Sequence, residues 1–182
     1  MSKSAKQARH SKIQCEAEGY LELGLARQAL GSLARLGDPT GFDPHSLYLW
    51  GEALRSLGRY EEALVPLGQG AAADPDNINI WVALAWCYKR TGHLELAIES
   101  LESALTAEPA EALLHYNLAC YWSLAGDKER TLQYLSQSLG MDPRYRQLVA
   151  DESDFDPFRE DPDFRRICQG KPVRDAHRGA AE

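Results

Sequence analysis

The sequence predicts an all-α protein in which four helical hairpins stack into a right-handed superhelix, followed by a short capping helix. Three observations predict this fold. Small and apolar residues recur in columns with a fixed step, each step contains two apolar stripes with helical spacing, and a glycine lies between the two stripes. Together they define repeats over 10–43, 44–77, 78–111 and 112–145.

The step of the repeat is 34 residues. Pro75, Pro109 and Pro143 follow one another at that interval. Further columns share the register: glycine at 24, 58, 92 and 126, leucine at 33, 67, 101 and 135, small residues at 17, 51, 85 and 119, and alanine at 29, 63 and 97. Such columns indicate stacked copies of one supersecondary unit rather than chance composition.

Repeat 78–111 shows the chemistry of one unit. Trp81, Leu84, Ala85 and Tyr88 are spaced i, i+3, i+4 and i+7, which places them on one face of a helix. A second stripe follows at 97, 101 and 104. Gly92 lies between the stripes, where a helix ends in a left-handed conformation that glycine adopts without steric cost. Each repeat is therefore expected to be a helix–turn–helix hairpin.

These columns resemble the tetratricopeptide repeat family, whose period is also 34 residues. Repeat 78–111 matches best. Repeat 112–145 has His115 and Thr131 where the family has Trp and Ala, and repeat 10–43 departs most, with Glu16 and Gly41 at signature positions. The resemblance, which includes a tail typical of bacterial members, implies a concave groove that binds a peptide or protein segment.

The family's groove-facing positions map onto the first helix of each repeat. An aromatic or aliphatic anchor is expected on Trp86 and Tyr116, and a carboxylate on Arg55, Lys89 or Arg90. The alternative is that the basic side chains are only solvated and that Trp86 packs against a neighbouring helix. The predicted partner-binding residues are Tyr48, Glu52, Arg55, Val82, Trp86, Lys89, Arg90, Tyr116 and Cys120.

The two ends differ from the repeats. Residues 1–9 are basic and residues 170–182 are polar, and we expect both to be disordered. Residues 146–169 carry three of the chain's four phenylalanines, and Asp161–Pro162 is a favourable helix start. This segment either caps the apolar end of the last repeat or places its Phe155–Phe164 stretch in a groove as a self-ligand.

Composition excludes several other functions. A net charge of −7 disfavours nonspecific nucleic-acid binding, and no apolar run reaches the ~20 residues of a membrane span. The N-terminus lacks the apolar core of a secretory signal, so a cytoplasmic location is expected. Four separated cysteines and scattered histidines predict no disulfide, metal site, cofactor or catalytic centre. The acidic cluster at 151–156 lacks the pattern of a calcium loop.

The sequence therefore predicts a non-enzymatic scaffold or adaptor that binds a protein or peptide segment. Two alternatives stay open. One is a dedicated chaperone for a secreted or aggregation-prone partner, similar to type III secretion chaperones. The other is a structural homo-oligomer that assembles through its ends or its tail.

Overall fold

The computed structural model describes residues 3–171, and this part of the chain contains helices and no β-strand. This part of the chain forms two compact units, an N-terminal unit that ends at Ala107 and a C-terminal unit that begins at Glu108. The all-α class predicted from the sequence is confirmed. Within the described residues, no helix combines the length and the apolar character needed to cross a bilayer.

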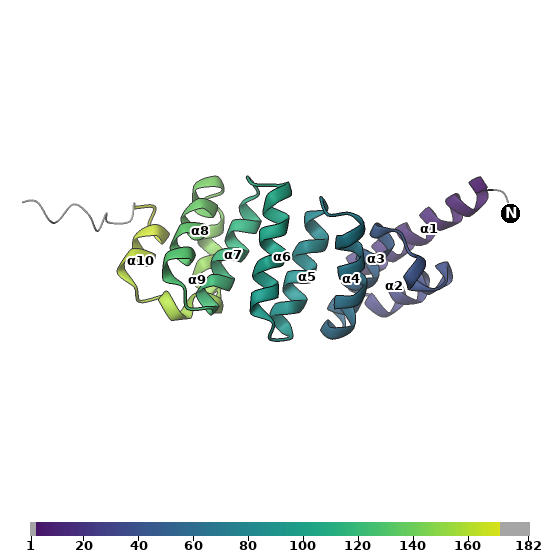
Figure 1. The fold of residues 1–182 in the computed structure, drawn as a ribbon, viewed down its shortest axis with the longest axis horizontal. Helices are drawn as coiled ribbons and strands as arrows, with labels where there is room; N and C mark the ends of the chain where they lie inside the picture. The colour runs from purple at the N-terminus through teal and green to yellow at the C-terminus, as the bar shows by residue number, and fades with distance from the viewer. Residues whose placement is uncertain (1–2, 172–182) are drawn as a thin grey trace, which may run out of the picture. The chain divides into compact units, whose positions relative to one another are not determined.

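The N-terminal unit is built from consecutive antiparallel hairpins (Figure 1). Short 3₁₀ turns η1 (Ala34–Leu36) and η2 (Pro39–Gly41) connect the first hairpin to the second. The paired helices are α1 (Lys3–Glu22) with α2 (Ala26–Leu33), α3 (Pro44–Ser56) with α4 (Tyr60–Ala73), and α5 (Ile78–Arg90) with α6 (Leu94–Ala107). Helices α3 and α5 begin 34 residues apart, as do α4 and α6, so the helices follow the step of the sequence columns.

Glycine makes the turn inside each hairpin. Gly58 and Gly92 have φ values of 73° and 81°, a conformation that other residues adopt at a cost. The residue after the glycine then forms a hydrogen bond to the preceding helix: Arg59 N–H donates to the Leu54 carbonyl at 3.0 Å. This is the Schellman arrangement, which satisfies carbonyls at the helix end. Gly24 and Gly126 occupy the equivalent positions, with φ values of 72° and 78°.

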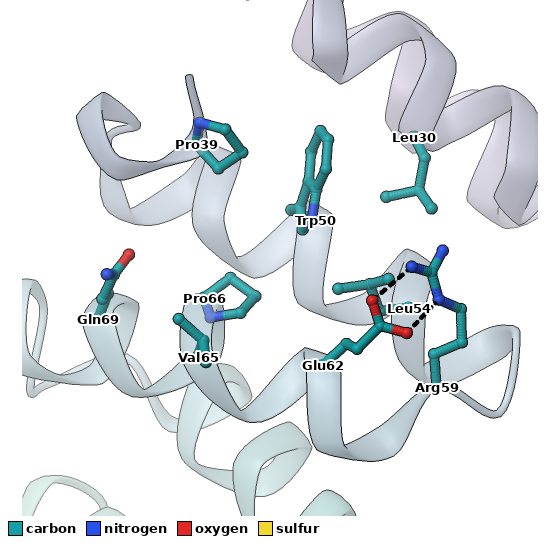
Figure 2. A pocket seen from close by; sticks show the side chains of 9 residues that line it. All are labelled: Leu30, Pro39, Trp50, Leu54, Arg59, Glu62, Val65, Pro66 and Gln69. Atoms are coloured by element: carbon teal, nitrogen blue, oxygen red, sulfur yellow. Dashed lines mark hydrogen bonds and ion pairs between the residues drawn. The ribbon is translucent and has the colours of Figure 1, made fainter. Parts of the chain in front are cut away.

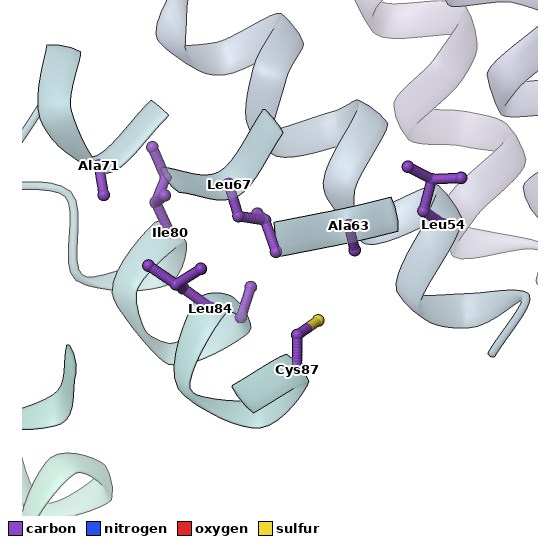
Figure 3. Packing of buried hydrophobic residues seen from close by; sticks show 8 residues of the cluster. Leu54, Ala63, Leu67, Ala71, Ile80, Leu84 and Cys87 are labelled. Atoms are coloured by element: carbon purple, nitrogen blue, oxygen red, sulfur yellow. The ribbon is translucent and has the colours of Figure 1, made fainter. Parts of the chain in front are cut away.

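The core between neighbouring hairpins is made of buried aliphatic side chains (Figure 3). The cluster joins α3, α4 and α5 and contains Leu54, Ala63, Leu67, Ala71, Ile80, Ala83, Leu84 and Cys87. Gly51 lies directly against Leu67, so the absence of a side chain there allows α3 and α4 to approach closely. Burying one such leucine stabilises the fold by about 2 kcal/mol.

Asp43 fixes the start of α3 and ties it to α1. Its carboxylate accepts a hydrogen bond from Ser46 N–H at 3.2 Å, which caps the helix, and pairs with His10 Nε2 at 2.7 Å. Gln14 Nε2 donates to the same carboxylate at 3.1 Å. Burial opposes ionisation of Asp43, but hydrogen bonds from Ser46 and His10 outweigh it and hold its pKa below the ordinary value of 3.8.

The prediction that residues 1–9 are disordered is wrong for 3–9, which form the first turns of α1. The segment is rich in alanine, lysine, glutamine and arginine, which are good helix formers. It also continues an existing helix, and extension avoids the cost of nucleation. Arg9 anchors it further, because its Nη2 donates to the Arg35 carbonyl at 3.1 Å.

The C-terminal unit begins with the hairpin of α7 (Ala112–Leu124) and α8 (Lys128–Met141). Helix α9 (Tyr145–Asp151), 3₁₀ helix η3 (Ser153–Phe158) and α10 (Pro162–Cys168) follow, with η3 against α7 and α10 against α8. The predicted helix start is confirmed, since Asp161 caps α10 by accepting from the amides of Asp163 and Phe164.

Charged contacts hold α10 on α8. Lys128 Nζ lies 2.6 Å from the Asp161 carboxylate and 3.1 Å from that of Asp163. Phe164 and Ile167 of α10 are buried. The predicted disordered tail over 170–182 lies outside the described residues from 172 onward.

Candidate functional site

The predicted binding residues of the N-terminal unit lie on two adjacent helices, α3 and α5, which are in contact. Along each helix they are spaced i, i+4 and i+7, so they share one side of that helix. We call this surface the α3–α5 face. It consists of Tyr48, Glu52 and Arg55 on α3 and Val82, Trp86 and Lys89 on α5.

Trp86 is the exposed aromatic residue of this face. Its side chain is 40% exposed, a large fraction for a tryptophan. Lys89 Nζ lies 5.6 Å from the centre of the Trp86 ring, within the range of a cation–π contact. The two residues present an apolar surface with a positive charge beside it, the pairing predicted for an aromatic anchor and a carboxylate.

Arg55 is engaged within the protein. Its Nε and Nη2 atoms donate to the two carboxylate oxygens of Glu52, both at 2.7 Å. This fork-like pair raises the pKa of Arg55 above its ordinary value, against the opposing effect of burial. The pair therefore contributes a nearly neutral patch to the α3–α5 face rather than an uncompensated positive charge.

Tyr48 and Val82 are half-buried and form the base of the face. Tyr48 packs against the buried clusters on both sides of α3, and burial raises its pKa. These two residues serve packing as well as surface shape.

Arg90, which is also predicted to bind a partner, is exposed at the end of α5. Its Cζ atom lies 5.2 Å from the centre of the Tyr60 ring at the start of α4. One residue of helix rotates a side chain by about 100°, so Arg90 turns away from the side that carries Lys89. Its guanidinium stacks on the neighbouring hairpin.

The prediction that Tyr116 and Cys120 are open to a partner is wrong. They occupy the positions equivalent to Val82 and Trp86 but are only 5% and 2% exposed. Helix η3 packs against α7, where the Phe155 ring lies 5.8 Å from that of Tyr116 at 79°. The Tyr145 ring lies 5.0 Å from the Tyr116 ring. Burial raises the pKa of Tyr116 accordingly.

A group of possible metal ligands lies beside this contact. Donor atoms of Cys120, Glu152 and Asp154 come within 4.8 Å of one another. However, the Glu152 carboxylate already accepts from Asp154 N–H at 3.1 Å and so caps η3. Three donors, one of them used in a helix cap, do not make a metal site, and we assign none.

Sequence reasoning missed a hollow on the other side of the N-terminal unit (Figure 2). It has a volume of about 260 Å³, and the Arg59–Glu62 ion pair lies at its edge. Its lining residues come from α2, η2, α3 and α4: Leu30, Pro39, Trp50, Leu54, Arg59, Glu62, Val65, Pro66 and Gln69. The available signal was Pro66, a proline inside a helix, together with the exposed Val65.

Comparison with known proteins places this fold. Residues 54–119 match the family described as tetratricopeptide repeat. No curated protein sequence matches the chain. Among solved structures, one of MamA is 18% identical with a TM-score of 0.66, covering 75% of this chain and 80% of that one.

Two further structures show the same likeness. MamA from Desulfovibrio magneticus RS-1 is 22% identical with a TM-score of 0.66, covering 88% of this chain and 94% of that one. YrrB, described as a TPR protein with an unusual peptide-binding site, is 17% identical with a TM-score of 0.66, covering 74% and 70%.

The fold is thus that of an α-helical repeat solenoid. The helical hairpins and the 34-residue step agree with the tetratricopeptide repeat match over residues 54–119, so this segment has the sequence of that family and the described chain has its fold.

Proposed function

We propose that this chain is a protein-interaction scaffold that binds a segment of another protein on the α3–α5 face. The observation that carries the proposal is Trp86, a tryptophan 40% exposed beside Lys89. Large rigid aromatic side chains dominate the energetics of many interfaces. Leaving such a ring in water forgoes the free energy that its burial in a complex provides.

The C-terminal unit contains an internal example of such binding. There Tyr116, at the helix position equivalent to Val82, contacts the Phe155 ring of the chain's own η3. Phe155 is flanked by Asp154 and Asp156. By analogy, a segment with an aromatic residue and a nearby carboxylate is the ligand that best suits Trp86 and Lys89.

Two other considerations support a peptide rather than a small molecule. The Glu52–Arg55 pair supplies a fixed polar patch on the same face, as expected for a surface that orients a polar backbone. YrrB shares the fold and is described as having a peptide-binding site.

The test is capture of a partner from the native lysate on immobilised protein. Wild type is compared with Trp86→Ala and with Leu25→Ala, a matched control at a side chain 39% exposed in the α1–α2 turn. We expect wild type and Leu25→Ala to retain the same protein and Trp86→Ala to lose it. Truncation of an interface anchor costs roughly 2 kcal/mol or more, about thirtyfold in affinity.

Equal retention by all three baits would overturn the assignment to this face. The hollow lined by α2, η2, α3 and α4 (Figure 2) then becomes the surface to test, and Val65→Glu is the variant that would disturb it.

A further inference from the structure

Charge is segregated along α1. Its first half carries Lys6, Arg9 and Lys12, all exposed, whereas Glu16, Glu18 and Glu22 follow in its second half. The three basic residues recur every third position and so span about a third of the helix circumference. Like charges at this spacing repel one another and lower helix stability by a few tenths of a kcal/mol per pair. A basic stripe of this kind is unusual in a chain of net charge −7.

A basic hollow adjoins this stripe. It has a volume of about 220 Å³ and is lined by Lys6, Arg9, His10, Arg35 and Leu36 from α1 and η1. Glu16 pairs with Arg35 and Asp43 pairs with His10, both at 2.7 Å. The carboxylates of Glu16 and Asp43 thus offset only part of the positive charge that the lysine, the two arginines and the histidine supply. The hollow therefore has excess positive charge and suits a carboxylate of another molecule.

The complementary surface lies on α6. Glu95, Glu99 and Glu102 are exposed and spaced i, i+4 and i+7, so their carboxylates form one acidic stripe along the helix. Leu96, 40% exposed, lies next to the stripe. Here too, like charges at i, i+3 and i, i+4 are unfavourable in isolation. The acidic stripe is about 10 Å long and the basic stripe about 9 Å, at 1.5 Å per residue.

The two stripes belong to helices at opposite ends of the N-terminal unit. Helix α1 packs with α2, α3 and η1, whereas α6 packs with α5 (Figure 1). They do not meet within one unit, so a contact between them requires two molecules.

We propose that copies of this chain associate head to tail, with the basic surface of one copy (Lys6, Arg9, Lys12 and Arg35) docked on the acidic stripe of α6 in the next. The association relieves repulsion within both stripes, because each supplies the other's counter-charges. The carboxylates enter the basic hollow, where Leu36 provides an apolar wall for Leu96. The basic and acidic surfaces differ, so a pair of bound copies still has one free basic surface and one free acidic surface. Further copies can therefore bind, and the contact builds a ring or a growing chain.

The proposal does not involve the α3–α5 face and is independent of the proposed function. Its test is sedimentation of the purified full chain over a concentration series at ~50 mM and ~500 mM salt, because exposed charge pairs are screened strongly at the higher value. We expect concentration-dependent assembly at low salt and its loss at high salt.

Charge reversal then identifies the surfaces. Lys6→Glu/Arg9→Glu should weaken self-association roughly tenfold or more, as should Glu99→Lys/Glu102→Lys. A chain carrying all four reversals should associate again, because the attraction is restored with its signs exchanged. Arg27→Glu, an exposed reversal on α2, is the control and should leave assembly unchanged. Circular dichroism confirms that each variant keeps its helices.

Three results would overturn the proposal. The first is a wild type that stays monomeric at low salt. The second is assembly that survives ~500 mM salt, which points to an apolar interface. The third is failure of the fourfold variant to recover association while its helices remain intact.

Discussion

The Phe155 ring meets the Tyr116 ring edge-on, with the ring centres 5.8 Å apart and the planes at 79°. Phe155 also lies 5.4 Å from Phe164 of α10, so three aromatic rings from α7, η3 and α10 form one contact. Edge-to-face pairs of this kind add to the free energy of burial. The segment after the last hairpin is therefore part of the folded core of the C-terminal unit.

Replacing Phe155 by alanine should lower stability by about 3–5 kcal/mol, because a fully buried ring leaves a cavity on α7. Thermal or denaturant unfolding measures this. Phe158→Ala, at a half-buried residue of the same turn, is the control and should cost much less. Equal losses for the two variants would show that Phe155 does not hold the segment in place.

Gly51→Ala should destabilise the protein by about 1–3 kcal/mol, because the new methyl group would overlap the buried Leu67 side chain. Gly68→Ala on α4 provides the matched control. Outside its own helical turn, no atom lies within 4 Å of a methyl group added there. It should stabilise the helix by up to about 1 kcal/mol. Chemical denaturation of both variants checks the opposite signs, and a stable Gly51→Ala protein would contradict the close packing of α3 on α4.

Asp43→Ala should cost about 1 kcal/mol at neutral pH, the usual worth of a helix cap. The folded state lowers the pKa of Asp43 below 3.8, so its carboxylate stabilises the fold fully above that value. The contribution is lost as pH falls through the lower pKa of the folded state. The difference in unfolding free energy between wild type and variant should therefore shrink as the pH falls below 3.8. Asp76→Ala, in an exposed loop, is the control, and a difference that does not change with pH would contradict the carboxylate's role.

Cys87 should resist alkylation in the folded protein, whereas exposed Cys15 should react readily. Burial raises the pKa of Cys87 to about 11. At about pH 8 only roughly one thiol in a thousand would be ionised, and the thiolate is the nucleophile. Peptide mass spectrometry after a short iodoacetamide pulse distinguishes the two sites. Denatured protein, in which both should react, is the control. Rapid labelling of native Cys87 would show that the buried cluster of α3, α4 and α5 opens easily.

Much of the fold could be predicted from the sequence because the repeat constrains it locally. The glycine column marks turns that require positive φ, and the small residue at 51 marks a close helix approach. These features depend on neighbours within one or two hairpins, so a single 34-residue frame captures them.

The candidate site was less accessible to sequence reasoning. Position within the repeat predicted both Trp86 and Tyr116 to face the groove, but it carries no information about where the chain runs after the last repeat. Only the structure shows that η3 covers Tyr116 and leaves the side of α5 with Trp86 exposed. Likewise, Arg55 and Lys89 share a helix position, yet the nearby Glu52 neutralises Arg55.

The contacts of η3 and α10 with the last hairpin also determine where this protein can be lengthened. A further 34-residue block inserted between 77 and 78 would find hairpins of its own kind on either side. A block appended after Gln169 would follow α10 instead of a repeat hairpin. Helix α10 is held by Lys128, and its Phe164 side chain is already buried, so it offers no hairpin surface for stacking. Duplication during evolution, or by design, should therefore extend this array from within and leave its C-terminal segment at the end.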